Sequence, residues 1–497
     1  MHYIDPKGLT RRLFLQRSSA LAMAGTAMPF ALSLSAMSDA AAQTATDYKA
    51  LVCVFLFGGC DYANTVVTYD NDSHAKYTGI RVAQSAGGIA IAQAALTPTL
   101  LSPTTPLVNG RQYALHPDMA STAGVPSMKT LFDAGNAAVQ LNVGPLVVPL
   151  NRALYNNSNK RQYPQPPKLF SHNDQQSIWQ SSSPEGSTIG WGGNIGDLVL
   201  GQNSNSLFTC ISVSGNAVFL SGDSTLQYQV GTGGAVKIRS ITDTTTFGSA
   251  TVKQAMATLA QRSRGHVLEN EYNTVTQRAV AAEGTVTTAI GTTSAYAGQF
   301  PATGLGRQLE MVARLIKGRG QMGAKRQVFF VSMGGFDLHD NLIANQGGLL
   351  RQLSEALGRF HTVMAAEGLG DKVTAFTASD FGRTLASNGD GADHGWGNHH
   401  FVVGGAVQGN AIYGYAPPVS IDNATNSAGY DGHVGQGRLI PTTSVDQYGA
   451  TLGKWFGLSD GQLGEILPNL KNFGGGDLTV AGTQVSYPKD VGFMKTV

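Results

Sequence analysis

The sequence KVTAFTASDFGRTLASNGDGADHGWGNHH, residues 372–400, joins an apolar run to a group of acids and histidines. An apolar run that ends abruptly in carboxylates and imidazoles indicates a buried strand whose carboxyl end opens onto a site, because open α/β sheets bind their ligands there. Mixed aspartate and histidine ligands suit zinc or manganese better than calcium, which prefers oxygen alone. The stretch therefore predicts a metal-dependent hydrolase. Its aspartates and histidines in one glycine-rich turn region are Asp380, Asp390, Asp393, His394, His399 and His400.

Two further apolar runs end in the same way. The run at residues 48–57 is followed by two glycines, Cys60 and Asp61, and the run at residues 326–333 by two glycines, Phe336 and Asp337. A helix N-cap or a turn is the structural alternative for each aspartate. The recurrence favours a site, because the carboxyl ends of parallel strands share one edge of a sheet. The side chains expected to converge there are Asp61, Asp337, His339 and Asp380.

The segment FSHNDQQSIW, residues 170–179, is the candidate carrier of a nucleophile or ligand. A serine at the start of a helix faces the positive end of the helix dipole, where an anionic substrate binds. Ser171 and His172 therefore become candidate catalytic residues, although the segment taken alone favours Ser171 as a simple N-cap and His172 as a surface residue, because capping serines far outnumber catalytic ones. Arg383 can neutralise substrate oxygens or serve as a salt-bridge partner. His399 or His400 can complete a metal shell or protonate a leaving group.

The remaining pattern predicts one α/β domain over residues 43–475, with a mostly parallel central sheet and helices on both faces. A helix is expected over residues 115–132 and buried strands over residues 137–143 and 401–407. An inserted region at about residues 200–300 combines short β-like runs at 206–213 and 217–220 with one or two surface helices in 251–282. Amphipathic stripes predict helices over 305–316 and 349–364. A closing helix is expected over 445–457 and a C-terminal tail over 476–497.

Composition indicates the class of protein, and the N-terminal sequence indicates its cellular compartment. The chain has 497 residues, of which 42% are hydrophobic and 13% charged, which indicates a globular protein with a large core. Thr10-Arg11-Arg12-Leu-Phe-Leu begins a twin-arginine export signal, and Ala40-Ala-Ala offers small residues for its cleavage after residue 42. We therefore expect a periplasmic or secreted protein handled by the twin-arginine export machinery.

Without residues 1–42 the formal net charge falls from +2 to about zero, so the sequence has no basic surface that would indicate nucleic-acid binding. The three cysteines, Cys53, Cys60 and Cys210, do not form a disulfide framework or a zinc-finger spacing. Burial as ordinary thiols is the simpler expectation, and a bridge from Cys210 to either of the others stays open.

The combination of the twin-arginine signal with GGCDYANTVV, FSHNDQQSIWQ, GGFDLHD, SDFGRT and DHGWGNHH resembles the bacterial family labelled domain of unknown function 1501. These motifs span most of the chain after the signal. That family is similar, more remotely, to the sulfatase and alkaline phosphatase superfamily. The resemblance implies a large α/β sandwich with a site for two divalent cations at the carboxyl edge of the central sheet.

The resemblance also implies roles for individual residues. Metal ligands would be Asp61, Asp337 with His339, and Asp380, while the histidine that follows such an aspartate in the superfamily would come from Asp393-His394, since Phe381 follows Asp380 here. The nucleophile position would fall on Ser171 or its neighbour His172. The sulfatase signature Cys/Ser-x-Pro-x-Arg is absent from the sequence, so the resemblance does not imply formylglycine chemistry.

The function predicted from these observations is hydrolysis of a phosphate or sulfate ester, on a small molecule or a polymer. Two cations would activate Ser171 or a water and stabilise the oxygens of an in-line displacement. The alternative is an inactive exported protein that keeps the same fold and binds or assembles with a cell-envelope partner. Bound metal without turnover would distinguish the alternative from the hydrolase.

Overall fold

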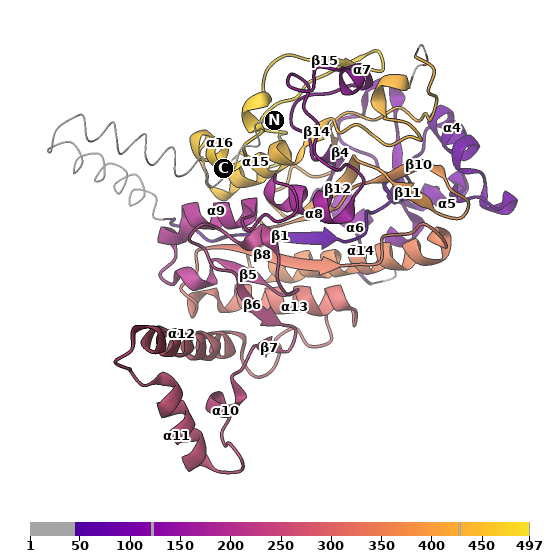
Figure 1. Cartoon of the computed structure of the whole chain (residues 1–497). Coiled ribbons are helices and arrows are strands. Elements are labelled where there is room, and N and C mark those ends of the chain that lie inside the picture. Colours follow the sequence, from indigo (N-terminus) through magenta and orange to yellow (C-terminus); the bar gives the residue numbers. More distant parts are fainter. Residues whose placement is uncertain (1–44, 121–123, 426, 428, 497) are drawn as a thin grey trace, which may run out of the picture.

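We describe a computed structural model of the chain, which defines residues 45–120, 124–425, 427 and 429–496 (Figure 1). The predicted export signal, residues 1–42, lies outside the described residues. Among the described helices, none is long and apolar enough to cross a membrane.

A ten-stranded sheet forms the centre of the described chain, in the order β13-β4-β12-β9-β1-β8-β5-β6-β7, with β14 paired to β4. The central strand β1 (Lys49–Leu56) is parallel to both of its neighbours, β8 (Arg326–Met333) and β9 (Val373–Ser379). These three strands confirm the apolar runs predicted from the sequence. The mostly parallel α/β class is likewise confirmed, and the other strands of the sheet are β4 (Ala137–Gly144), β5 (Cys210–Ser212), β6 (Tyr228–Gly231), β7 (Gly234–Ala235), β12 (Asn398–Val403), β13 (Ala411–Tyr413) and β14 (Thr443–Ser444).

Helices cover both faces of this sheet (Figure 1). Alternate residues of β1 point to opposite faces, so Val52 and Val54 belong to one hydrophobic core while Cys53 and Phe55 belong to the other. Because both faces are covered, β1 is apolar nearly throughout. The first core is closed by α6 (Met128–Asp133), α13 (Gly304–Lys317) and α14 (Leu342–Ala366), and the second by α9 (Trp191–Val199), α15 (Val445–Phe456) and α16 (Asp460–Ile466).

Three segments differ from the prediction. In the described part of residues 115–132, where one helix is expected, Pro117–Met119 form a 3₁₀ turn and α6 begins at Met128, because Pro126 cannot continue a helix and Ser127 makes a capping box with Thr130. The apolar run Val218–Leu220 is a 3₁₀ turn rather than a strand. The strand expected from residue 401 begins at Asn398 and runs antiparallel to β9 and β4, so two histidines predicted in a turn lie inside the sheet.

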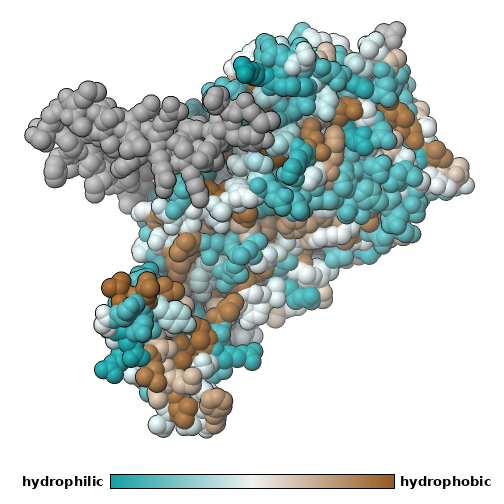
Figure 2. Space-filling view, viewed as in Figure 1, coloured by the Kyte–Doolittle hydropathy of each residue, from teal (hydrophilic) through white to brown (hydrophobic). Residues whose placement is uncertain are grey.

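The inserted region contains a helical hairpin that projects from the body of the protein (Figure 1). Its helices are α11 (Ala250–Gln261) and α12 (Val267–Ile290), which confirms the surface helices expected there. Figure 2 shows hydrophobic side chains on this projection. The large apolar side chains exposed on the two helices are Val252, Met256, Leu259, Val267, Leu268, Tyr272 and Val275.

The C-terminal segment packs onto the domain instead of lying apart from it. Its hairpin consists of β15 (Leu478–Val480) and β16 (Thr483–Val485), and Tyr487 and Phe493 are buried. The remaining short elements with strand or α-helical geometry are α3 (Tyr62–Thr65), β2 (Val66–Thr68), α4 (Asn71–Arg81), α5 (Gln93–Leu96), β3 (Tyr113–Leu115), α7 (Arg152–Asn156), α8 (His172–Ser181), α10 (Arg239–Thr242), β10 (Arg383–Ser387) and β11 (Ala392–His394).

Candidate metal centre

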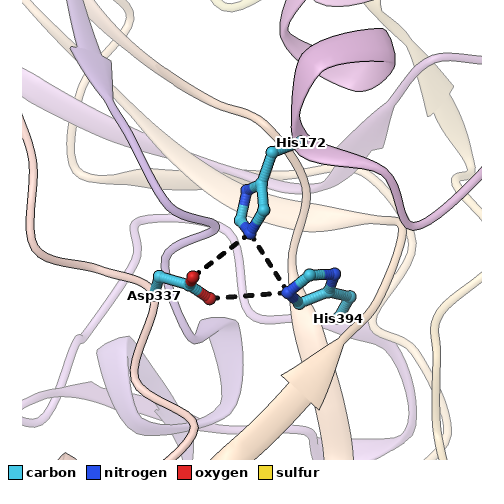
Figure 3. A group of neighbouring side chains, drawn as sticks. All are labelled: His172, Asp337 and His394. Carbon is cyan, nitrogen blue, oxygen red and sulfur yellow. Dashed lines mark hydrogen bonds and ion pairs between the residues drawn. The ribbon is translucent and has the colours of Figure 1, made fainter.

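Four segments that are distant in sequence bring their polar side chains to the carboxyl ends of β8 and β9. Asp337 and His339 follow β8, Asp380 follows β9, and His394 ends the β10–β11 hairpin. His172 is the first residue of α8. Figure 3 shows the side chains of His172, Asp337 and His394 pointing toward one another. The predicted convergence of acids and histidines at this edge of the sheet is therefore observed for these residues.

The Nδ1 atoms of the three histidines face oxygens that only accept hydrogen bonds. His172 Nδ1 lies 2.7 Å from Asp380 Oδ2, and His394 Nδ1 lies 2.7 Å from the Phe170 carbonyl oxygen. His339 Nδ1 lies 3.3 Å from Asp393 Oδ1. Each Nδ1 must therefore carry a proton and donate it, so Nε2 is the nitrogen of each ring whose lone pair can bind a cation.

These three Nε2 atoms converge. His394 Nε2 lies 3.1 Å from His172 Nε2 and 2.8 Å from His339 Nε2. Asp337 Oδ1 lies 3.2 Å from His339 Nε2 and 3.4 Å from His394 Nε2, and Asp337 Oδ2 lies 3.4 Å from His172 Nε2. Tetrahedral ligands at zinc distances lie roughly 3.3 Å apart. The donor set therefore suits a divalent cation, and the contacts that His394 and Asp337 make with the other histidines are close to this spacing.

Asp380 stands behind His172 and is completely buried. Its Oδ2 atom accepts hydrogen bonds from His172 Nδ1, from Gln176 Nε2 at 2.8 Å and from the Gly58 amide at 3.2 Å. Its Oδ1 atom is buried without a hydrogen-bond partner among the described residues. A carboxylate that orients a histidine in this way fixes both its tautomer and its ring position, as is common around protein metal sites.

Arg383 holds the strand ends together. Its side chain is 1% exposed and donates to the carbonyl oxygens of Gly58, Gly59, Phe336 and Ala392, and it is ion-paired with Asp337 Oδ1. The sequence leaves two roles open for Arg383, contact with substrate oxygens and a salt-bridge partner, and the ion pair with Asp337 matches the second. Since its nitrogens are already bonded to the protein, the structure places it as a positioning residue for the two turns.

The charges of the site shift its pKa values in opposite directions. The hydrogen bond to Asp380 raises the pKa of His172 against the effect of partial burial. Burial lowers the pKa of His394, and neighbouring Arg383 and His172 add to this effect. Burial alone would raise the pKa of Asp337, but its hydrogen bond and ion pair with Arg383 outweigh this and lower it. At neutral pH the centre therefore presents an ionised carboxylate and a neutral His394.

Asp61 lies outside this centre, although its motif resembles that of Asp337. Its side chain is 2% exposed, and it forms an ion pair with fully buried Arg81 through contacts of 2.5 Å and 2.8 Å. It also caps α3 by accepting a hydrogen bond from the Ala63 amide. The N-cap alternative stated for this aspartate is thus what the structure shows.

His399 and His400 lie inside β12 and away from the cluster. His399 Nδ1 accepts a hydrogen bond from the Asn142 amide, and His400 packs against Trp179 and Tyr448. Burial lowers the pKa of both to about 3, so both rings are neutral. Both histidines therefore contribute to the packing of the sheet, and the metal role predicted for His399 and the catalytic role predicted for His400 are not what the structure shows.

The hydroxyl of Ser171 donates to Asp174 Oδ2 at 2.9 Å, and the residue precedes α8 without capping it through its side chain. Sequence reasoning did not find Gln176 or Arg81, which complete the surroundings of Asp380 and Asp61. The only local signal was the helical spacing of His172 and Gln176, four residues apart on one face of α8.

Comparisons with known proteins place the chain in a family without assigning an activity. No curated protein matches it. One similar solved structure is described as "Crystal structure of Ps i-CgsB in complex with k-i-k-neocarrahexaose", with 10% identity, a TM-score of 0.32, and coverage of 86% of this chain and 77% of that one. Another, described as a glycosaminoglycan-locus protein of Bacteroides thetaiotaomicron (BT33494S-sulf), has 11% identity, a TM-score of 0.31, and coverage of 84% and 74%.

The family model described as "Protein of unknown function (DUF1501)" matches residues 48–467, which include every residue of the candidate centre. The chain therefore belongs to the DUF1501 family.

Proposed function

We propose that this protein is an exported, metal-dependent hydrolase of phosphate or sulfate esters. The observation that carries the proposal is the convergence of His172, His339 and His394 on Asp337 at the carboxyl edge of the sheet. The ester class and the export route rest on the sequence motifs described above.

The cluster needs a positive charge at its centre. The lone pair of His394 Nε2 lies 3.1 Å from His172 Nε2 and 2.8 Å from His339 Nε2, and lone pairs this close repel unless a proton or a cation lies between them. The guanidinium of Arg383, whose Nη1 atom lies 3.4 Å from His339 Nε2, offsets part of this repulsion. A bound divalent cation would supply an activated water and would stabilise negative charge on the ester oxygens. The chain's own residues would hold that cation through nitrogen and carboxylate ligands, a donor set typical of zinc.

The surroundings allow a substrate to reach the centre. The side chains of Asp337 and His339 are 47% and 44% exposed, whereas Asp380 and Arg383 behind them are buried. The ligands thus lie between a rigid, buried support and solvent. Ser171 is the candidate protein nucleophile, and Asp174 Oδ2 is placed to take its hydroxyl proton. A water is the alternative nucleophile.

The proposal is tested with the purified exported protein, before and after chelation. We expect bound zinc, manganese or a similar ion, a lower melting temperature after chelation, and turnover of a model phosphomonoester, phosphodiester or sulfate ester. Asp337→Ala should remove both the metal and the turnover. The matched control is Asp133→Ala, since Asp133 is also 47% exposed but is paired with Lys129. Metal-free wild type with unchanged stability would contradict the proposal.

A second candidate is a binding or assembly role at the cell envelope. The observation that favours it is the projecting α11–α12 hairpin, where Leu268 and Tyr272 are 75% and 72% exposed (Figure 2). Bound metal without turnover on any ester class, together with an unchanged Ser171→Ala variant, would favour this candidate over the hydrolase.

A further inference from the structure

We infer that the centre holds one cation per chain, bonded to His172, His339, His394 and Asp337, and that Asp380 and Asp393 orient two of these histidines without bonding to the cation. The inference rests on the metal centre of the proposed function and makes its ligand set definite. It departs from the two cations implied by the family resemblance and from the ligand roles expected for Asp61, Asp380, Asp393 and His399.

The inner set is defined by atoms that face inward. The Nε2 atoms of His172 and His339 both lie close to His394 Nε2, and the two oxygens of Asp337 lie close to all three Nε2 atoms. Arg383 approaches the same group from its buried side, with Nη1 3.4 Å from His339 Nε2 and Nη2 bonded to Asp337 Oδ1. Each Nδ1 atom faces outward and is already bonded to an oxygen of the protein. An imidazole ring cannot rotate to present Nδ1 to the cation without breaking its outward hydrogen bond. The hydrogen bonds that fix the tautomers therefore also fix Nε2 as the ligand atom.

Asp380 is assigned as an orienting carboxylate, not a ligand, because its Oδ2 atom is already hydrogen-bonded to the protein. Three hydrogen bonds converge on Oδ2, from an imidazole, an amide side chain and the backbone of Gly58. These bonds hold the carboxylate behind the His172 ring, on the side opposite to Nε2. Asp393 Oδ1 has the corresponding place behind His339 and also accepts from Asn388 Nδ2 at 2.9 Å, but Asp393 is 38% exposed and its support is weaker.

Two residues expected as further metal ligands, Asp61 and His399, are bonded to other parts of the protein. Both oxygens of Asp61 are bonded to Arg81, and His399 Nδ1 is bonded to the backbone of β4. Within residues 45–120, 124–425, 427 and 429–496, the group of three ligand residues within 4.8 Å of one another is His172, Asp337 and His394. His339 joins this group through its contacts with His394 and Asp337. The buried Oδ1 atom of Asp380 has no hydrogen-bond partner among the described residues, which makes Asp380 the decisive residue to test.

The first measurement is stoichiometry. The purified wild-type protein is stripped with a chelator, titrated with Zn²⁺ or Co²⁺, and freed from unbound ion before elemental analysis. One equivalent per chain is the expected result. Two equivalents would overturn the inference and leave the proposed hydrolase intact, whereas none would overturn both. One equivalent without ester turnover would support the ligand set while removing the hydrolase.

The second measurement separates an orienting carboxylate from a ligand. The visible spectrum of bound Co²⁺ depends on the atoms bonded to the ion. Asparagine at position 380 can still accept the His172 Nδ1 hydrogen, so Asp380→Asn should weaken Zn²⁺ affinity about 10–100-fold. At saturating Co²⁺ its spectrum should match that of the wild type. His394→Ala removes an inner ligand and should change the spectrum.

One further variant and one stability measurement serve as controls for the Asp380→Asn result. Asp393→Asn tests the more exposed orienting carboxylate and should weaken Zn²⁺ affinity less than Asp380→Asn does, with the same spectrum. Urea unfolding of each metal-free variant shows whether it is folded at the assay temperature. If Asp380→Asn is folded and its saturated Co²⁺ spectrum changes as strongly as that of His394→Ala, then Asp380 is a ligand and the inference is wrong.

Discussion

Two neighbouring strands end in the same motif and yet differ completely in what their aspartates do. After β1 the chain reads Gly58-Gly-Cys-Asp61, and after β8 it reads Gly334-Gly-Phe-Asp337. Asp61 is 2% exposed and paired with Arg81, whereas the Asp337 side chain is 47% exposed and faces three histidines. One turn is a sealed structural element, and the other supplies the candidate metal centre.

The glycine turns that follow the two strands account for the difference. The paired register ends at Leu56 and Met333. Beyond this pair, Gly58 and Gly59 both have positive φ, whereas in the second turn Gly335 does, so the two chains leave the sheet along different paths. A repeated motif at the edge of a parallel sheet therefore identifies candidates for a site, while the backbone path of each turn decides which of them enter it.

The strongest test of this comparison removes the charge of Asp61. We expect Asp61→Asn to lower the free energy of unfolding by about 3–5 kcal/mol, because it leaves buried Arg81 without its carboxylate. Urea unfolding of the metal-free protein measures the loss. Asp70→Asn is the control, since Asp70 also caps a helix and pairs with an arginine but is 17% exposed. An Asp61→Asn protein that keeps its stability but no longer binds Zn²⁺ would place Asp61 in the centre.

A second test exchanges one glycine in each turn. Gly58 and Gly335 have φ values of +110° and +98°, so alanine at either position costs about 1–2 kcal/mol of stability. A Cβ atom on Gly58 would also lie 2.4 Å from the Asp337 amide nitrogen, whereas one on Gly335 would meet only Leu349 at 3.5 Å. Gly58→Ala should therefore cost roughly 1–3 kcal/mol more.

The same two variants also test whether the packing of the turns affects Zn²⁺ binding. Because the Gly58 clash displaces Asp337, Gly58→Ala should weaken Zn²⁺ binding, while Gly335→Ala should bind as the wild type does. Isothermal titration with Zn²⁺ measures both affinities. Equal losses of affinity in the two variants would show that the close packing of the turns does not position Asp337.

The smallest expected effect concerns acid. The unfolded chain binds a proton at His400 below about pH 6.5, whereas the folded protein does so only near its pKa of about 3. Stability is therefore lost as the pH falls through this range, by about 2 kcal/mol between pH 7 and pH 5 for this one residue. His400→Gln should remove that part of the loss, measured by urea unfolding in chelator at both pH values.

Exposed His266, at the start of α12, provides the control for this acid effect. His266→Gln should keep the wild-type dependence on pH. If His400→Gln and His266→Gln change the dependence equally, burial in β12 is not its cause. Burial lowers the pKa of His400, whereas the hydrogen bond to Asp380 raises the pKa of His172. Equal effects of the two variants would remove the first half of this contrast.

Local patterns in the sequence determined the sheet and the composition of its edge. The apolar runs of β1, β8 and β9 and the stripes of α13 and α14 follow from burial on one face or two, which depends on neighbours along the chain. They also predicted that Asp337, His339 and Asp380 would share an edge. The same reasoning misplaced His399 and His400, because a polar pair beside glycines gives no local sign that an antiparallel strand begins there.

Only the tertiary structure decided which polar residues are paired and which remain free. Asp61 meets Arg81 across 20 positions of sequence, and His172 meets Asp380 across 208. Such pairs depend on strand register and on where a loop returns to the sheet, and neither is encoded in the residues next to them. For this protein the sequence determined the fold class and the group of candidate residues, whereas long-range packing decided that three histidines and one aspartate face a common centre.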